Sequence, residues 1–308
     1  MPIKISKIKD KKIEIKIPPN SRVPIETSEH MFQHPINLLC CSKRGGGKTV
    51  LITNYLRALK EEDCLDRLFV ISPTIESNRA LLDSLNVKKD DIYDPEERGV
   101  VIQLLEQIDM ERDRYVEELT RVRRFAEFQK LLKSNIPLEC LDQSLVMEFN
   151  DFIYGKKDPP KLTYGHRPHM HCFIDDCQST ALFRDKMFHH LAIRSRHTGI
   201  MPYKKNDPEF CGALGVSLYI AIQNFTASNS GSCPRCVRNN VTQMAICGKS
   251  KDEKELMNIY TSVAGEIPYE DEYATKEQFG SLVIDLHPKK TALSKFRKDF
   301  NEYIILQP

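Results

Sequence analysis

A glycine-rich stretch early in the chain has the residues and the spacing of a phosphate-binding loop. Residues 42–49 read Ser-Lys-Arg-Gly-Gly-Gly-Lys-Thr, which matches the pattern G-x-x-x-x-G-K-[ST] except for serine in the first position. Consecutive glycines let backbone N–H groups ring a β-phosphate, the lysine reaches the β- and γ-phosphate oxygens, and the threonine hydroxyl ligates Mg²⁺. The stretch therefore predicts binding of ATP with Mg²⁺. The residues expected at the nucleotide are Ser42, Lys43, Arg44, Gly45, Gly46, Gly47, Lys48, Thr49 and Val50.

Two adjacent acids supply the second half of such a site. Asp175 and Asp176 follow the apolar run 170–174, and a phosphate loop needs an acid on its Mg²⁺ at the end of a neighbouring strand. We expect Asp175 to hold Mg²⁺, with Thr49, through coordinated water, and Asp176 to orient the attacking water. Two neighbouring carboxylates at a strand end are costly unless a cation is present, which favours this interpretation over an ordinary turn.

A polar pair follows another apolar run. Residues 216–222 end in Gln223 and Asn224. If this strand adjoins the strand that carries Asp175, Gln223 lies where the γ-phosphate and the attacking water are, because strand ends of a parallel sheet meet at one crevice.

Three arginines are candidates for completing a neighbouring subunit's site: Arg194, Arg196 and Arg238. A guanidinium inserted from a neighbour can stabilise the charge of a phosphoryl-transfer transition state. The sequence alone does not separate such an arginine from an ordinary surface arginine.

The elements that must position these residues alternate between short apolar runs and helical patterns, which predicts an α/β fold with a mostly parallel central sheet flanked by helices. The segment 99–134 has a heptad-like spacing of apolar residues. It is either a long helix on its own sheet, a hairpin with residues 137–153, or an intersubunit coil. Strands are expected at 36–41, 68–72, 170–174, 216–222, 241–247 and 281–286, and helices at 50–60, 78–85, 179–195 and 252–264.

Three parts of the chain are expected. Isoleucines alternate with lysines over 1–17, which predicts a β-hairpin, and the prolines of 18–30 predict a linker. Residues 31–250 form the ATPase core, with a helical insertion at about 97–153. Residues 251–308 form a C-terminal helix and strand segment with a basic tail. The polar segment 201–212 is expected to be an insertion or a surface loop.

Composition describes a folded protein and leaves its partners open. The 308 residues are 41% hydrophobic and 29% charged, with a formal net charge of +2, which neither demands nor excludes nucleic acid. The apolar run 213–222 is half of the ~20 residues of a membrane span, and no signal peptide is visible. We therefore expect no transmembrane segment and ten free thiols.

Several smaller features are weaker signals. Cys233 and Cys236 have the spacing of half a zinc site. The histidines at 166, 169 and 171 and at 189–190 have no ligand spacing typical of a metal hydrolase. A basic cluster near the C-terminus can contact phosphates or face solvent: Lys289, Lys290, Lys295, Arg297 and Lys298.

Five motifs together resemble the FtsK/HerA superfamily of DNA-pumping ATPases: SKRGGGKT, CFIDDC, RSRHTGI, IAIQN and CPRCVRNN. The likeness is greatest to the DNA-packaging ATPases of nucleocytoplasmic large DNA viruses, poxviruses included, and of virophages, and it covers roughly residues 34–250. It implies a RecA/FtsK-HerA-like fold of the P-loop NTPases and ATP hydrolysis. It also implies Gln223 as the sensor and Arg196 as the finger reaching into a neighbour, with Arg238 as the second choice.

The resemblance implies an ATP-driven double-stranded DNA translocase that packages a viral genome into a capsid. Its partners would be the DNA backbone, copies of itself in a hexameric or pentameric ring, and capsid or membrane-associated viral proteins. It would act in the host cytoplasm, at the viral factory, or in the virion. Three alternatives remain: a nucleoside or small-molecule kinase, a helicase, and a slowly hydrolysing scaffold or switch.

Overall fold

The computed structural model defines most of the chain outside its ends. The hairpin expected over 1–17 lies outside the described residues, as does the first part of the linker that follows it. The described residues are 25, 27–75, 79–134, 137–153, 155, 157–205, 207–226, 232–248, 253–259, 261–262 and 280–305.

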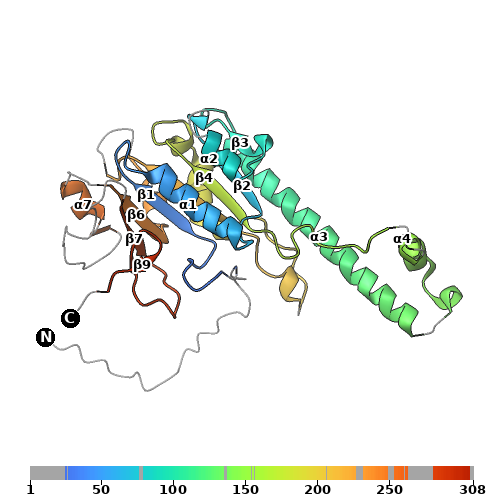
Figure 1. Ribbon diagram of the computed structural model, residues 1–308. Coiled ribbons are helices and arrows are strands. Elements are labelled where there is room, and N and C mark those ends of the chain that lie inside the picture. The colour runs from blue at the N-terminus through green and yellow to red at the C-terminus, as the bar shows by residue number, and fades with distance from the viewer. Residues whose placement is uncertain are drawn as a thin grey trace, which may run out of the picture.

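The described strands form one sheet. They are β1 Asn37–Cys41, β2 Arg67–Ile71, β3 Ile92–Tyr93, β4 Met170–Ile174, β5 Val216–Ile222, β6 Gln243–Cys247, β7 Ser281–Asp285, β8 Phe296–Lys298 and β9 Glu302–Tyr303. Their order in the sheet is β3-β2-β4-β5-β1-β6-β7-β8-β9, and the first six are parallel while the last three are antiparallel to their neighbours (Figure 1). This confirms the predicted α/β fold with a mostly parallel central sheet.

Helices cover both faces of that sheet. They are α1 Lys48–Glu61, α2 Arg79–Ser84, α3 Val100–Lys133, α4 Gln143–Ile153, α5 Lys186–Arg194, α6 Arg235–Arg238 and α7 Glu253–Ile259. Buried side chains of α1 and α2 share one core with one face of the sheet, whereas those of α3, α5, α6 and α7 share a second core with the other face.

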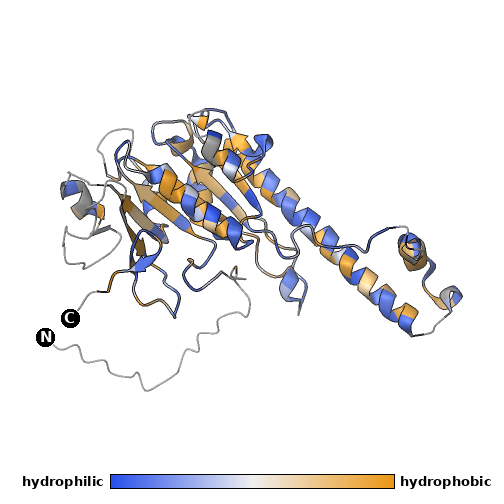
Figure 2. Ribbon diagram, in the orientation of Figure 1, coloured by the Kyte–Doolittle hydropathy of each residue, from blue (hydrophilic) through white to orange (hydrophobic). Residues whose placement is uncertain are grey.

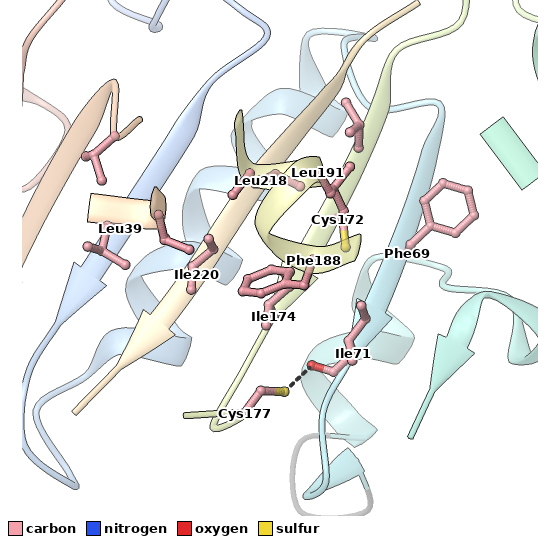
Figure 3. Packing of buried hydrophobic residues seen from close by; sticks show 14 of the residues in the cluster. Leu39, Phe69, Ile71, Cys172, Ile174, Cys177, Phe188, Leu191, Leu218 and Ile220 are labelled. Carbon is pink, nitrogen blue, oxygen red and sulfur yellow. Dashed lines mark hydrogen bonds between the residues drawn. The ribbon is translucent and has the colours of Figure 1, made fainter. Parts of the chain in front are cut away.

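The two cores follow from the alternation of side chains along a strand. In β5, Leu218 and Ile220 belong to the core under α3 and α5, and Tyr219 and Ala221 belong to the core under α1. Every residue of β5 is buried, as expected for a central parallel strand with both faces covered. Figure 3 shows Phe188 of α5 over this face, and the strands are the most hydrophobic segments of Figure 2.

The prediction of one continuous helix over 179–195 is wrong. A single 3₁₀ turn at Leu182–Arg184 is followed by Asp185, whose carboxylate accepts the Met187 backbone N–H and caps the start of α5. Aspartate is a favoured N-cap because its side chain satisfies a backbone donor that the helix leaves unpaired. A second helix start inside the run was therefore readable at Asp185.

The helical insertion forms an arm. The first half of α3 packs on the sheet through Val101, Leu104 and Ile108, and the rest runs away from it to α4 at the far end (Figure 1). There the helices share a small separate core, built around Phe128 and Phe149, whose ring centroids are 5.6 Å apart. Both single-chain interpretations of 99–134 are thus present, each in one half of the helix.

Replacing Phe149 with alanine is expected to open the far end of the arm without loosening the sheet. Phe149 is fully buried, and removing a buried phenyl ring costs about 3 kcal/mol, which corresponds to roughly hundred-fold faster amide exchange by local opening. Hydrogen exchange read by mass spectrometry over 124–152 measures this. Met147→Ala is the control, because Met147 lies in the same helix and is 80% exposed. Equal acceleration in the sheet would show that the arm is not a separate unit.

The turn between α3 and α4 carries an accessible thiol. Cys140 lies in the 3₁₀ turn Leu138–Cys140 and is exposed, whereas the other nine cysteines of the chain are buried or half-buried.

The segment 201–212 packs against the arm and is not a free surface loop. The Arg123 guanidinium donates to the Asp207 carboxylate, and the Tyr115 hydroxyl donates to Glu209 Oε2 at 2.6 Å. Arg167, from the segment that returns from the arm, donates to the backbone carbonyl of Glu209 at 2.8 Å. These contacts tie the insertion to α3 and to the start of β4.

Strands β7 to β9 continue the sheet of the core, and they remove Arg297 from the basic surface suggested by the sequence. Arg297 is 2% exposed, and its guanidinium lies 4.6 Å from the ring centroid of Phe32 and 4.8 Å from that of Tyr303. Lys289 donates to the hydroxyl of Thr27 at 2.8 Å. Arg297 and Lys289 thus both make contacts within the protein that connect the C-terminal strands to residues 27–32.

None of the described helices is long and apolar enough to cross a bilayer.

Candidate nucleotide site

The glycine-rich loop joins β1 to α1, as its sequence predicts. Gly45 and Gly47 have φ angles of 78° and 88°, a region that glycine occupies without the strain of a side chain. Gly46 has no such φ, but a Cβ there would lie 1.7 Å from the Ser42 hydroxyl oxygen. Serine in the first position of the loop therefore requires glycine at position 46.

Lys48 begins α1 inside the loop. Its side chain is buried, and its ammonium donates to the carbonyl oxygens of Ser42 at 2.8 Å and of Lys43 at 3.3 Å. A cation and the N-terminus of a 14-residue helix thus meet in one concave loop, and both favour an anion such as a phosphate.

Thr49 contacts the first of the two acids. Its hydroxyl donates to Asp175 Oδ2 at 3.0 Å. Asp175 is 3% exposed, and its backbone N–H donates to the Ile71 carbonyl at 3.0 Å, which fixes the end of β4 against β2. A hydroxyl and a carboxylate at this distance can both enter the coordination shell of Mg²⁺, directly or through a coordinated water.

Asp176 and Gln223 form a second pair beside the first. Gln223 Nε2 donates to Asp176 Oδ1 at 3.0 Å. Asp176 is exposed and has a φ of 54°, so the chain turns sharply and presents its carboxylate at the strand end. The contact exists because β5 lies between β1 and β4 in parallel register, which is the condition that the sequence prediction placed on Gln223.

Most of these groups line one pocket of about 320 Å³, whereas Ser42, Lys43 and Gly46, which were also expected at the nucleotide, are not among its lining residues. Because β5 separates the loop strand from the acidic strand, the pocket is closed by side chains from three strand ends. Its lining residues are Arg44, Gly45, Gly47, Lys48, Thr49, Val50, Asp175, Asp176 and Gln223.

A cysteine beside the acids is structural. Burial, together with the charge of Asp175, raises the pKa of the Cys177 thiol well above its usual value. The thiol donates to the carbonyl oxygens of Ile71 and Asp175 at 3.3 and 3.2 Å, the first of which is drawn in Figure 3. Cys177 therefore stays protonated and helps to fix the end of β4.

Gln178 fixes the end of β5, and the sequence analysis missed it. Its Oε1 accepts the backbone N–H of Gln223 at 2.7 Å and of Asn224 at 3.1 Å, and its Nε2 donates to the Asn224 carbonyl. One amide thus satisfies three backbone groups where β5 ends. The sequence did contain a signal for this role: Gln178 is an amide side chain only two residues after Asp176, close to the two acids of the candidate site.

Replacing Gln178 with alanine is expected to destabilise the protein by about 1 kcal/mol, because the backbone N–H groups of half-buried Gln223 and exposed Asn224 lose their acceptor. Urea unfolding measures the change. Ser179→Ala, at the exposed neighbouring position, is the control and is expected to keep the native stability. Equal stability of Gln178→Ala and the native protein would exclude this positioning role.

The arginines proposed to act in trans lie outside this pocket. Arg196 is exposed and lines a different pocket, of about 240 Å³, together with Asn37 and Gln243. These two residues begin β1 and β6. Arg196 therefore lies at the N-terminal ends of the parallel strands, whereas the loop lies at their C-terminal ends. Arg194, two residues earlier, is exposed as well.

Arg238 is held within its own chain. Its guanidinium lies 5.2 Å from the ring centroid of Phe225, and its Nε is buried with no hydrogen-bond partner among the described residues.

The half zinc site does not gain further ligands in the described part of the chain: neither Cys233 nor Cys236 belongs to a group of three potential ligands there. Burial raises the pKa of Cys233 to about 12.

No family model matches the sequence, and no curated protein matches it. Among solved structures, the chain is similar to the genome packaging NTPase B204 from Sulfolobus turreted icosahedral virus 2 in complex with AMPPCP, with 12% identity and a TM-score of 0.42 over 82% of this chain and 92% of that one. It is also similar to EssC (ATPases 2 and 3) from Geobacillus thermodenitrificans, with 11% identity and a TM-score of 0.43 over 95% of this chain and 49% of that one.

This chain therefore spans about half the length of the EssC chain. At this level of overlap the likeness concerns the outline of the fold, and the function of this chain has to be argued from its own site.

Proposed function

We propose that the protein is an ATPase that translocates double-stranded DNA and packages a viral genome. The observation that carries the hydrolytic part is the pairing of Asp176 with Gln223 at 3.0 Å in the pocket that also holds Lys48 and Thr49. A site that only binds nucleotide needs the loop, whereas a site that hydrolyses it also needs a fixed acid to orient water.

Each group has a task in that reaction. Lys48 and the loop N–H groups bind the phosphates. Thr49 and Asp175 would hold Mg²⁺, and the ion would supply positive charge to the phosphate oxygens. Asp176 orients a water molecule and takes its proton while the water oxygen bonds to the γ-phosphorus and the bond to the β-phosphate oxygen breaks. Gln223 holds Asp176 in place and can donate to the γ-phosphate.

The translocase part of the proposal is supported by the motifs that resemble packaging ATPases and by the position of Arg196. Because Arg196 is exposed and lies at the strand ends opposite to its own site, any nucleotide that it contacts would be that of another subunit, as in a ring. Binding of DNA would be through its backbone and independent of its sequence.

Steady-state ATP hydrolysis with and without linear duplex DNA tests the function. We expect several-fold stimulation by duplex that falls steeply with salt, because phosphate contacts release counterions. Hydrolysis indifferent to duplex but accelerated by a nucleoside would replace the translocase with a kinase. Strand separation of a forked duplex would assign a helicase instead.

Mixed oligomers test the arginine. Subunits carrying Arg196→Ala, mixed with subunits carrying Lys48→Ala, are expected to restore part of the hydrolysis only where an intact Arg196 faces an intact loop. Arg194→Ala, two residues away and equally exposed, is the matched control. Full activity of the Arg196→Ala homo-oligomer would remove this residue from the mechanism.

A further inference from the structure

A second cluster of chemically active side chains lies at the N-terminal ends of the parallel strands, whereas the nucleotide pocket lies at their C-terminal ends. Asp66 directly precedes β2, and His169 directly precedes β4. These two strands are neighbours in parallel register, so the two residues meet although they are 103 positions apart. His166 lies in the segment that returns from the arm and stacks its ring on that of His169, with centroids 4.4 Å apart.

The donor atoms of the three residues converge. One ligand atom from each lies within 4.8 Å of the other two. The Nδ1 atoms of His166 and His169 lie 3.6 and 3.8 Å from Asp66 Oδ2. Tetrahedral zinc, with bonds of about 2.0–2.2 Å, places neighbouring donors roughly 3.4 Å apart, so both separations need only a small adjustment.

The cluster leaves a polar atom without a partner. His169 Nδ1 is buried and has no hydrogen-bond partner in the part of the chain that the structure describes. It points at a carboxylate that is beyond hydrogen-bond distance, and that carboxylate belongs to a side chain only 10% exposed. Buried polar atoms are almost always paired, so an orphaned imidazole nitrogen facing a carboxylate indicates a missing cation.

Burial acts in opposite directions on the two kinds of side chain in the cluster: it favours the neutral imidazole of His169, which is the form that binds a metal, and disfavours the charged carboxylate of Asp66. Burial, together with the neighbouring His166, lowers the pKa of His169 to about 3, which keeps its imidazole neutral. Burial also raises the pKa of Asp66 to about 6, and the nearby Asp63 and Glu111 contribute to that rise. The guanidinium of Arg67, the residue next to Asp66, is paired with Asp91 and Glu111.

We propose that Asp66, His166 and His169 bind a divalent transition-metal ion of the zinc class, with water completing a tetrahedral shell. Two imidazole nitrogens and one carboxylate suit Zn²⁺ and its relatives, whereas Mg²⁺ and Ca²⁺ prefer shells of oxygen alone. The His166 Nδ1 lies 2.9 Å from the Arg167 carbonyl oxygen. That contact would give way to the ion, because the same Nδ1 is the ring nitrogen that faces Asp66.

The ion would link the segment that returns from the arm to the sheet. His166 and His169 flank Arg167, whose guanidinium holds the 208–211 segment. One ion at Asp66 would therefore fix the start of β2, the start of β4 and the chain returning from the arm. It would be separate from the Mg²⁺ at Asp175, because the two lie at opposite ends of β4.

Cobalt titration tests the site, because Co²⁺ in a tetrahedral nitrogen and oxygen shell absorbs strongly in the visible range. Untagged protein without nucleotide is expected to bind one Co²⁺ with that spectrum, to lose the spectrum on addition of Zn²⁺, and to unfold at a higher temperature with Zn²⁺ than with a chelator. Asp175→Asn is expected to keep the spectrum, which separates this site from the nucleotide pocket.

The ligand variants sharpen the test. Asp66→Asn and His169→Ala are expected to weaken Co²⁺ binding at least tenfold, and His190→Ala, an exposed histidine outside the cluster, to leave it unchanged. His166→Ala, a more exposed ligand, gives the same test if His169→Ala does not fold. A weak octahedral spectrum and a melting temperature indifferent to Zn²⁺ would show that the cluster is only a histidine and carboxylate ion pair and would overturn the proposal.

Discussion

Replacing Lys48 with alanine is expected to lower ATP hydrolysis by about 10³-fold, since a fixed cation aimed at the charge that develops on the phosphate oxygens is among the largest single contributions to catalysis. Lys48 is buried in the loop, where its ammonium donates to the carbonyl oxygens of Ser42 and Lys43. No neighbouring cation in that loop is held in the same place, because Lys43 and Arg44 are exposed. Release of inorganic phosphate under steady-state conditions measures the loss.

Lys186→Ala is the matched control for this variant, because Lys186 is an exposed lysine at the start of another helix. Its hydrolysis is expected to equal that of the native protein. Circular dichroism of both variants shows whether they fold. If Lys48→Ala hydrolyses ATP at more than a tenth of the native rate, the loop is not the catalytic phosphate site.

Replacing Asp176 with asparagine is expected to slow hydrolysis by about 10²- to 10³-fold while ATP still binds. The variant keeps Lys48, Thr49 and Asp175, so the groups proposed to bind nucleotide and Mg²⁺ remain. Asparagine tolerates the φ of 54° found at this position, so the change adds little strain. It removes the carboxylate that orients water and accepts its proton.

Binding of a fluorescent ATP analogue and single-turnover hydrolysis together read this prediction. Asp90→Asn, on an exposed turn, controls for loss of a surface charge. A variant that neither binds nor hydrolyses ATP would place Asp176 in the binding of the nucleotide or Mg²⁺. A variant with native hydrolysis would remove Asp176 from the reaction altogether.

The parts of the fold that the sequence predicts well are those in which one segment determines its own structure. The runs that became β1, β2, β4 and β5 are mostly apolar because both faces of a central parallel strand are covered. Strands β3 and β9 have two residues each. They exist only because a neighbouring strand offers backbone partners, and two residues carry no periodic pattern.

The candidate site divides in the same way. The contact between Thr49 and Asp175 was expected from the motifs, because a phosphate loop and an acidic strand end have one established relation. The contact between Gln223 and Asp176 depended on β5 lying between β1 and β4, and the order of strands in a sheet cannot be read from any single segment. Gln178 acts on the backbone of residues 45 and 46 positions away, which no local pattern records.

The histidines show the limit most clearly. Three positions separate His166 from His169, and that spacing alone is uninformative, because the third donor, Asp66, stands about 100 residues earlier in the chain. Only the parallel pairing of β2 with β4 brings the donors together.

The exposed thiol of Cys140 at the end of the arm allows the motion of the arm to be followed with a fluorescent label. A thiol-reactive fluorophore is expected to label Cys140 first, since the other nine cysteines are buried or half-buried. The dye would then sit beyond the last contacts of α3 with the sheet, where a small tilt of a helix about 50 Å long gives its largest displacement. Anisotropy or energy transfer from that dye can follow the arm through each cycle of ATP hydrolysis without any engineered cysteine.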